Sequence, residues 1–451
     1  MPVIHAAKAL TPEGWKSDVR LTIEGEAIAS VETGVAARAG DERHGLAAPA
    51  IANLHCHAFQ RGMAGLAELR GSAADTFWSW RETMYRFALT MSPDDVEAVA
   101  AQLYVEMLEA GFAAVAEFHY LHHAPDGSRY AAPAEMASRI VAAARQAGIG
   151  LTLLPAFYAH ATFGGAPPRP EQRRFVNDIE SFARLLEDCR ALMKGSSGAV
   201  GVAPHSLRAV TPGELSALVG LAGDAPIHIH AAEQIGEVED CLAWSGARPV
   251  QWLLDHAPLD SRWCLVHATH MDGEETRRLA RAGAVAGLCP VTEANLGDGV
   301  FNAPDFLAHG GVYGIGTDSN VLVGVAAELR QLEYGQRLRD HKRNVCAAAG
   351  GSTGRALYDA ASAGGARALT RRSGRLAAGA MADIVTLRAD HPSLAGRRDD
   401  QILDAWIFSV GDPLVDCLWS GGRKVVVDGR CPWRETIAAR FAAAMRGLCA
   451  R

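Results

Sequence analysis

The stretch LAAPAIANLHCH, residues 46–57, decides how this chain folds, because an apolar run ends there in two histidines, His55 and His57. Side chains two positions apart on an extended segment point in the same direction, so both imidazoles leave the strand end together. Imidazole is a common protein ligand of divalent metals. The stretch therefore predicts a buried strand with a hydrolytic metal centre at its carboxyl end.

Beyond this stretch, short apolar runs alternate with longer segments of helical spacing, a pattern typical of a parallel α/β sheet. Residues 94–111 and 132–148 show the helical spacing, and each segment closes on a glycine. We expect eight strands, at residues 53–57, 115–120, 151–157, 200–205, 227–233, 264–270, 285–292 and 312–318. Eight such alternations predict an α/β fold of the (β/α)8 TIM barrel type.

Polar residues gather where these strands end, and that rim carries the chemistry of barrel enzymes. The residues concerned are His55, His57, Glu117, His119, His205, His230, Glu233, His267, His270 and Asp318. Their placement predicts an active site at the carboxyl rim of the barrel.

Both ends of the chain differ from the barrel region, because they hold short alternating strands and glycine-rich turns. We expect residues 1–45 and 374–432 to form one small β-sandwich domain beside a metal-dependent barrel of residues 46–373. Residues 433–451 have apolar side chains at helical spacing, which predicts a C-terminal helix packed on its own subunit, with a homodimer as the expected assembly.

Composition narrows the class of protein. A net charge of −7, with no stretch dense in lysine and arginine, argues against nucleic-acid binding, which needs a concentrated basic face. No segment holds about 18 consecutive apolar residues, so we expect no membrane association. The nine cysteines include no CxxC pair, which is typical of free thiols in a reducing compartment. We therefore expect a cytoplasmic protein.

Several motifs, taken in order, resemble the amidohydrolase superfamily. They are the His-x-His pair after the first strand, His-Ala-Ala-Glu at 230–233, a histidine at 267 and Thr-Asp-Ser at 317–319. Gly-Arg-Leu at 374–376, followed by Ala-Asp-Ile-Val at 382–385, is similar to the return strand into the small β domain of that superfamily. Each motif alone is weak, whereas the ordered set is specific.

Further segments narrow the resemblance within the superfamily. Residues 53–60, 163–165, 172–175 and 204–208 look like N-formimino-L-glutamate deiminases of histidine degradation. This resemblance implies hydrolysis of an amidine C–N bond, with ammonia and a formyl amide as products.

The proposed metal ligands are His55, His57, His230 and Asp318, which offer three nitrogens and one carboxylate and leave a position for water. Binuclear members of the superfamily place a lysine at the end of the fourth strand, but residues 203–206 read Ala-Pro-His-Ser. We therefore expect one divalent metal. Zinc is favoured, and such ligands also accommodate Fe²⁺ or Mn²⁺.

The catalytic candidates are Glu233, His267 and Asp318. Glu233 follows His230 closely and could take a proton from water and pass it to the substrate nitrogen. His267 would hold the attacking water, although His270 competes for that role. The alternative for Glu233 is a helix cap, and His228, deeper in the same strand as His230, is better explained as a core residue.

The substrate-binding candidates follow from the two carboxylates of a formimino-glutamate. Arginine binds carboxylates through two parallel hydrogen bonds and stays charged, so Arg81 and Arg208 are the chosen partners. The resemblance adds Gln60, Tyr120 and His205 to the pocket.

Three functions stay open at this point. The first is deimination of N-formimino-L-glutamate. The second is deamination or dechlorination of a purine, pyrimidine or triazine ring, for which aromatic walls would be expected in place of two arginines. The third is a catalytically silent barrel that serves as a binding module, a class that usually lacks the metal ligands seen here.

Overall fold

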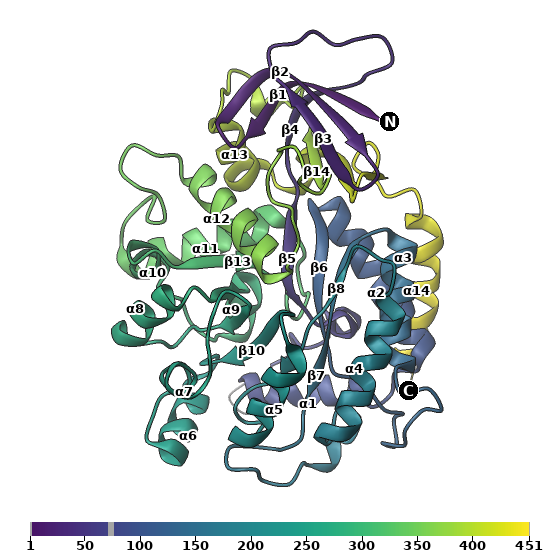
Figure 1. Cartoon of the computed structure of the whole chain (residues 1–451), viewed down its shortest axis with the longest axis vertical. Coiled ribbons are helices and arrows are strands. Elements are labelled where there is room, and N and C mark those ends of the chain that lie inside the picture. The colour runs from purple at the N-terminus through teal and green to yellow at the C-terminus, as the bar shows by residue number, and fades with distance from the viewer. Residues whose placement is uncertain (1, 71–75, 451) are drawn as a thin grey trace.

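A ring of parallel strands forms the centre of the computed structural model, which describes residues 2–70 and 76–450 (Figure 1). The strands are β5 (Ile51–Cys56), β6 (Phe112–His119), β7 (Gly150–Phe157), β8 (Ala199–Val200) with β9 (Ala203–Pro204), β10 (Ile227–Ala231), β11 (Trp263–His267), β12 (Val285–Leu288) and β13 (Val312–Ile315). The strands pair in parallel within two groups: β5, β6 and β7 pair in order and β7 pairs with both β8 and β9, while β10 to β13 pair in order. The predicted (β/α)8 barrel is confirmed.

Two seams close the ring. At one seam, the amides of Thr317 and Asp318 both donate to the carbonyl of His55 at 3.0 Å, and the amide of His57 donates back to Asp318 O at 3.0 Å. At the other, single parallel bridges join Val202 to Ile227 and Ser206 to His230. The first seam therefore brings the first and last barrel strands together at the histidine pair.

The fourth strand is broken into β8 and β9, whereas the sequence predicted one strand over 200–205. Gly201 lies at the break, where an added Cβ would meet the carbonyl oxygen of Pro226 at 2.5 Å. Pro204 in β9 has no amide hydrogen to donate to a neighbouring strand. The short strand still carries its carboxyl end, with His205, to the rim.

Helices cover the outside of the barrel. They are α2 (Pro93–Glu109), α3 (Glu135–Ala147), α4 (Ile179–Met193), α5 (Pro212–Ala222), α6 (Ile235–Ser245), α7 (Pro249–His256), α8 (Gly273–Ala282), α9 (Pro290–Leu296), α10 (Ala303–Ala308), α11 (Val325–Asp340) and α12 (Thr353–Ala368). Side chains of Ser92, Asp178, Thr211 and Asp272 cap the first turns of α2, α4, α5 and α8. An insertion after β5 adds the 3₁₀ turn η1 (Ala58–Met63) and helix α1 (Phe77–Ala88), which lies over the rim.

The two ends of the chain meet in one small β domain, as predicted. Its seven strands are hydrogen-bonded in the order β16-β15-β14-β4-β1-β2-β3, with bounds β1 (Val3–Thr11), β2 (Gly14–Glu24), β3 (Ala27–Glu32), β4 (Glu42–Pro49), β14 (Ile384–Leu387), β15 (Val415–Ser420) and β16 (Arg423–Val426). Side chains from both ends, such as Ile4, Leu21, Ile384 and Trp419, enclose a separate apolar core. Only Ala50 separates β4 from barrel strand β5.

The last helix, α14 (Arg434–Cys449), packs along α2 on the outside of the barrel (Figure 1). Arg440 forms an ion pair with Glu97 of α2 at 2.9 Å, and Arg434 pairs with Glu109. Short helical segments complete the C-terminal region: η3 (Pro392–Leu394), α13 (Gln401–Ala405), η4 (Trp406–Val410) and η5 (Asp412–Leu414). Among the described residues, no helix combines the length and apolarity that crossing a membrane requires.

Candidate active site

Four side chains from three strand ends converge at the carboxyl rim of the barrel. His55 and His57 come from β5, His230 from β10, and Asp318 follows β13. One donor atom from each lies within 4.8 Å of the donor atom of every other, and all four residues are buried. The structure thus brings together the whole predicted set of metal ligands.

The spacing of these donors suits one small cation. His230 Nε2 lies 3.1 Å from His55 Nε2 and 3.4 Å from His57 Nε2. Asp318 Oδ1 lies 3.3 Å and 3.4 Å from the same two nitrogens. Donors around a tetrahedral zinc ion at about 2.0–2.1 Å are about 3.3 Å apart, so the donors need little movement to bind one.

The remaining ring nitrogens orient two of the imidazoles. His57 Nδ1 donates to the carbonyl of Phe118 at 2.9 Å, and His230 Nδ1 donates to the carbonyl of His205 at 2.8 Å. These bonds leave each Nε2 lone pair pointing into the site. Burial lowers the pKa of His55 to about 3 and also lowers the pKa values of His57 and His230, so all three are neutral donors.

Glu233 lies beside the four donors with its carboxylate buried. Its Oε1 is 3.7 Å from His267 Nε2, and its Oε2 is 3.7 Å from Arg208 Nη2. Burial raises the pKa of Glu233 above its ordinary value, because it disfavours the charged carboxylate. Glu237 of α6 accepts the backbone amide of Glu233 at 3.1 Å and so fixes the turn that presents it.

His267 is surrounded by acidic groups. Its Nδ1 lies 3.3 Å from Glu293 Oε1, and its Nε2 lies 3.9 Å from Asp318 Oδ2. Burial disfavours the imidazolium, but Glu233, Glu293 and Asp318 outweigh it and raise the pKa of His267 to about 10. His267 therefore carries a proton at the rim. Its rival His270 donates instead to the carbonyl of Asp298, which makes it a structural residue.

The backbone at this rim is strained where the site residues sit. His267 and Asp318 have φ values of 68° and 44°, and Ala232, next to Glu233, has 53°. Non-glycine residues seldom adopt positive φ, and such strain concentrates at functional sites.

For Asp318, burial opposes ionisation, yet the imidazoles of His55 and His57 outweigh it and lower its pKa.

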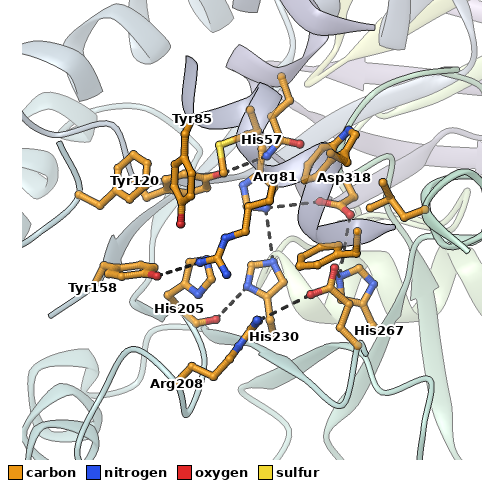
Figure 2. A pocket seen from close by; sticks show the side chains of 17 residues that line it. His57, Arg81, Tyr85, Tyr120, Tyr158, His205, Arg208, His230, His267 and Asp318 are labelled. Carbon is orange, nitrogen blue, oxygen red and sulfur yellow. Dashed lines mark hydrogen bonds and ion pairs between the residues drawn. The ribbon is translucent and has the colours of Figure 1, made fainter. Parts of the chain in front are cut away.

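Beside the predicted metal ligands lies a pocket, which residues of α1 also line (Figure 2). All five predicted substrate-binding residues line it, namely Gln60, Arg81, Tyr120, His205 and Arg208, together with the catalytic candidates Glu233, His267 and Asp318. Gln60 donates to the hydroxyl of Tyr120 at 2.9 Å. The pocket thus joins the predicted substrate residues to the metal donors.

The two arginines of the pocket differ in their hydrogen-bond partners. Arg208 is 7% exposed, and its Nε and Nη1 are buried without a hydrogen-bond partner among the described residues. Arg81 comes from α1 and lies over the rings of Tyr85 and Trp78 at 5.3 Å and 5.7 Å. It donates to the hydroxyl of Tyr158 at 3.1 Å (Figure 2). The Nη2 atom of Arg208 faces Glu233, whereas its Nε and Nη1 are free to bind an acceptor, which a ligand carboxylate would supply.

The sequence interpretation missed several residues of this site. Glu293, which orients His267, and Tyr158, which bonds Arg81, directly follow the expected strands 285–292 and 151–157, although Glu293 lies in α9 in the structure. Strand-end position was the available signal for both, but neither stands in a motif. The pocket also has aromatic walls, formed by Phe77, Trp80, Tyr85, Tyr120, Tyr158 and Phe175.

Comparison with known proteins shows which families and relatives the chain resembles. Its residues 46–425 match the amidohydrolase family, and residues 1–45 match the N-terminal domain of the formimidoylglutamate deiminase HutF. A formimidoylglutamate deiminase of Pseudomonas aeruginosa is 51% identical over 98% of both chains. An 8-oxoguanine deaminase of the same species is 28% identical over 89% of this chain and 87% of its own.

Solved structures agree with the fold. The crystal structure of an amidohydrolase from Brucella melitensis is 57% identical, covers 100% of both chains and superposes with a TM-score of 0.96. Atrazine chlorohydrolase TrzN from Arthrobacter aurescens, solved with zinc, is 22% identical and covers 99% of this chain and 100% of its own at a TM-score of 0.83, which shows a shared fold alone. On the match over 46–425 and on these relatives, the chain belongs to the amidohydrolase family.

Proposed function

We propose that this chain hydrolyses N-formimino-L-glutamate to N-formyl-L-glutamate and ammonia, a reaction of histidine degradation. The identity of 51% to a formimidoylglutamate deiminase over nearly the whole chain supports this substrate. The observation that carries the proposal is the buried guanidinium of Arg208, which faces Glu233 through Nη2 but has no hydrogen-bond partner at Nε or Nη1, beside the four proposed metal donors. A substrate with carboxylates and an amidine group would pair a carboxylate with the charge of Arg208 and present the amidine to the hydrolytic centre.

The metal ligands of the proposal are His55, His57, His230 and Asp318, and zinc is the favoured ion. Three neutral nitrogens and one carboxylate with tetrahedral spacing support this choice. When bound, the ion would act as a Lewis acid and lower the pKa of water from about 15.7 toward about 7.

Glu233 is the proposed proton carrier. Its carboxylate would accept a proton from the attacking water, and its raised pKa suits a group that then donates that proton to the departing nitrogen. Attack at the formimino carbon gives a tetrahedral carbon, and collapse expels ammonia and leaves the formyl amide.

His267 and Asp318 would hold the water between them. The protonated imidazole of His267, fixed by Glu293, offers an N–H toward the side of Asp318 and Glu233 on which water would attack. Asp318 would accept a hydrogen bond from this water through Oδ2, because its Oδ1 faces the histidines of β5. Each group thus has a separate task at a stated atom.

A second candidate is deamination of a heteroaromatic ring. The aromatic walls of the pocket favour it, contrary to the simple expectation that arginines and aromatic walls exclude one another. A ring that offers no acceptor to Arg208 would leave its buried Nε and Nη1 without a hydrogen-bond partner, which is costly. We therefore rank the dicarboxylate first. The third alternative, a silent binding module, is disfavoured by the preserved donor set.

The test is a screen for ammonia release from formimino-glutamate, from other formimino amino acids and from purine and pyrimidine rings, with metal analysis of the same sample. We expect turnover of the formimino dicarboxylate alone. Turnover of a ring with no release from formimino-glutamate would overturn the proposal in favour of the second candidate.

We further propose a cytoplasmic location and a homodimer. All nine cysteines are free in the structure, which supports a reducing compartment. Sedimentation of the purified enzyme would measure the assembly.

A further inference from the structure

Buried side chains hold both edges of the peptide unit that joins His57 to Ala58. The carbonyl of His57 accepts a hydrogen bond from Asn320 Nδ2 at 3.0 Å. The amide of Ala58 donates to Glu117 Oε1 at 2.8 Å. Asn320 follows β13 and Glu117 belongs to β6, the two strands that flank β5 in the ring. The main chain beside a proposed metal ligand is therefore fixed from both sides.

Asn320 also holds the main chain of a second proposed ligand. Its Nδ2 donates to the carbonyl of Asp318 at 2.7 Å, so both protons of the amide group are used. Asn320 is fully buried and has a φ of 60°, a left-handed conformation in which asparagine is several-fold enriched. One side chain thus links two proposed ligands that lie far apart in the sequence.

A chain of buried hydrogen bonds sets the orientation of the Asn320 amide. Asn53 Oδ1 accepts the backbone amide of Thr317 at 3.2 Å, which turns Asn53 Nδ2 toward the Thr317 hydroxyl at 2.7 Å. That hydroxyl then donates to Asn320 Oδ1 at 2.6 Å. The oxygen of Asn320 is therefore an acceptor, and its nitrogen faces the two carbonyls.

Glu117 gives the matching support on the side of β6. Its Oε2 accepts the hydroxyl of Tyr104, in α2, at 3.1 Å, while its Oε1 accepts the Ala58 amide. The next residue, Phe118, accepts His57 Nδ1 through its carbonyl, so β6 orients both the imidazole and the main chain of this ligand. Glu117 is 1% exposed and does not line the substrate pocket, so contact with substrate does not explain its place.

We propose that Asn320 and Glu117 are positioning residues of the metal centre, which hold His57 and Asp318 in the arrangement that an ion requires. Groups that orient metal ligands without touching the metal typically contribute about 10–100-fold to metal affinity. An ordered main chain also spares the ligands the entropy loss of ordering when the ion binds. This inference rests on the metal ligands of the proposed function and not on its substrate.

Asn320→Gly tests the first support. Glycine adopts positive φ without strain, so the variant removes the amide group and keeps the backbone conformation. We expect the Kd for zinc to rise about 10–100-fold. Competition with a chromophoric chelator, titrated against the metal-free protein well below its melting temperature, measures this change.

Two replacements of Glu117 separate its acceptor from its charge. Glu117→Ala removes the acceptor of the Ala58 amide and should raise the Kd for zinc by a similar factor. Glu117→Gln keeps an oxygen for that amide and offers its NH₂ group to the hydroxyl of Tyr104. This conservative variant should therefore bind zinc nearly as tightly as wild type.

Substitution with Co²⁺ reports the geometry of the ligands without turnover, because its visible absorption depends on coordination number and symmetry. Wild type and Glu117→Gln should give the same bands. Asn320→Gly and Glu117→Ala should give shifted or weaker bands, because His57 and Asp318 are no longer held in place.

Thr152→Val is the matched control for a general loss of stability. The hydroxyl of Thr152 is buried and donates to the carbonyl of Leu369 at 3.0 Å, near the amino end of β7 and away from the rim. The variant should lower the melting temperature of the metal-free protein and leave the Kd for zinc unchanged.

Wild-type zinc affinity in both Asn320→Gly and Glu117→Ala would overturn the proposal. An equal loss of affinity in Thr152→Val would also overturn it, because reduced stability would then explain the effect. If the two variants lose affinity as expected but zinc-loaded wild type releases no ammonia from formimino-glutamate, the positioning role stands and the proposed function falls.

Discussion

At the scale of single residues, the proposed chemistry depends most on Glu233. Its carboxylate faces a protonated histidine on one side and an arginine on the other, while its own pKa is raised by burial. Those two neighbours favour the anion, and burial favours the neutral acid. A group under such opposed influences can lose and regain a proton within one turnover.

Glu233→Gln should keep the metal and lose most of the turnover. The amide retains the size of the side chain but cannot move a proton, so we expect kcat to fall by about 10²–10⁴-fold. Ammonia release with parallel metal analysis measures both quantities. Turnover close to wild type would remove Glu233 from the mechanism.

Arg208→Met should separate binding from stability. The variant removes a guanidinium with two buried, unpaired nitrogens, and an unsatisfied buried group costs about 1–3 kcal/mol. We therefore expect a higher thermal midpoint for the ligand-free protein together with a large rise in KM for the dicarboxylate. A lower midpoint would mean that Arg208 stabilises the empty pocket.

At the scale of elements, the sequence predicted the position and order of all eight strands, because buried parallel strands show as apolar runs that end in polar residues. The break in strand four was not predicted, since it depends on the close approach of Gly201 to the Pro226 carbonyl, a contact between neighbouring strands. The domain limits at 45, 373 and 432 stay predictions.

The same reasoning explains which residues of the site could be predicted from the sequence. The proposed metal ligands and proton carriers stand in short motifs at strand ends, so the sequence could suggest them. The contacts of Glu293 and Gln172 could not be proposed, although Glu293 follows an expected strand and Gln172 stands in a segment of the resemblance. Only the fold brings Glu293 to His267 and Gln172 to Tyr158. Hydrogen-bond partners of this kind leave no local pattern.

The seam between β13 and β5 offers a prediction at this scale. An added Cβ on Gly316 would lie 2.7 Å from the carbonyl oxygen and 2.8 Å from the amide nitrogen of His55. Gly316→Ala should therefore push the histidine strand away, lower stability by about 1–3 kcal/mol and weaken metal binding.

Gly213→Ala on α5 is the matched control, because an added Cβ there meets nothing within 4 Å. It should be neutral or slightly stabilising. Thermal melts and metal titration of both variants make the comparison. Equal metal affinity in the two variants would contradict the role assigned to the seam.

At the scale of the whole molecule, the bound ion should stabilise the folded barrel. Its four donors come from the first, fifth and eighth strand positions, so a ligand that binds only the folded state stabilises the entire ring. At a thousandfold excess over Kd this amounts to about 4 kcal/mol. A chelated preparation should lose ammonia release and melt at a lower temperature, and zinc should restore both. Activity that survives complete metal removal would contradict the mechanism.

The shared seam at His55 also orders events during synthesis. The carbonyl of His55 closes the ring with the amides of Thr317 and Asp318, and the same two segments supply three of the four donors. A ribosome must therefore translate past codon 318 before the nascent polypeptide can retain its ion in this site. A bound ion would then indicate that the barrel is complete, and a chain truncated before residue 318 would bind no ion at this site.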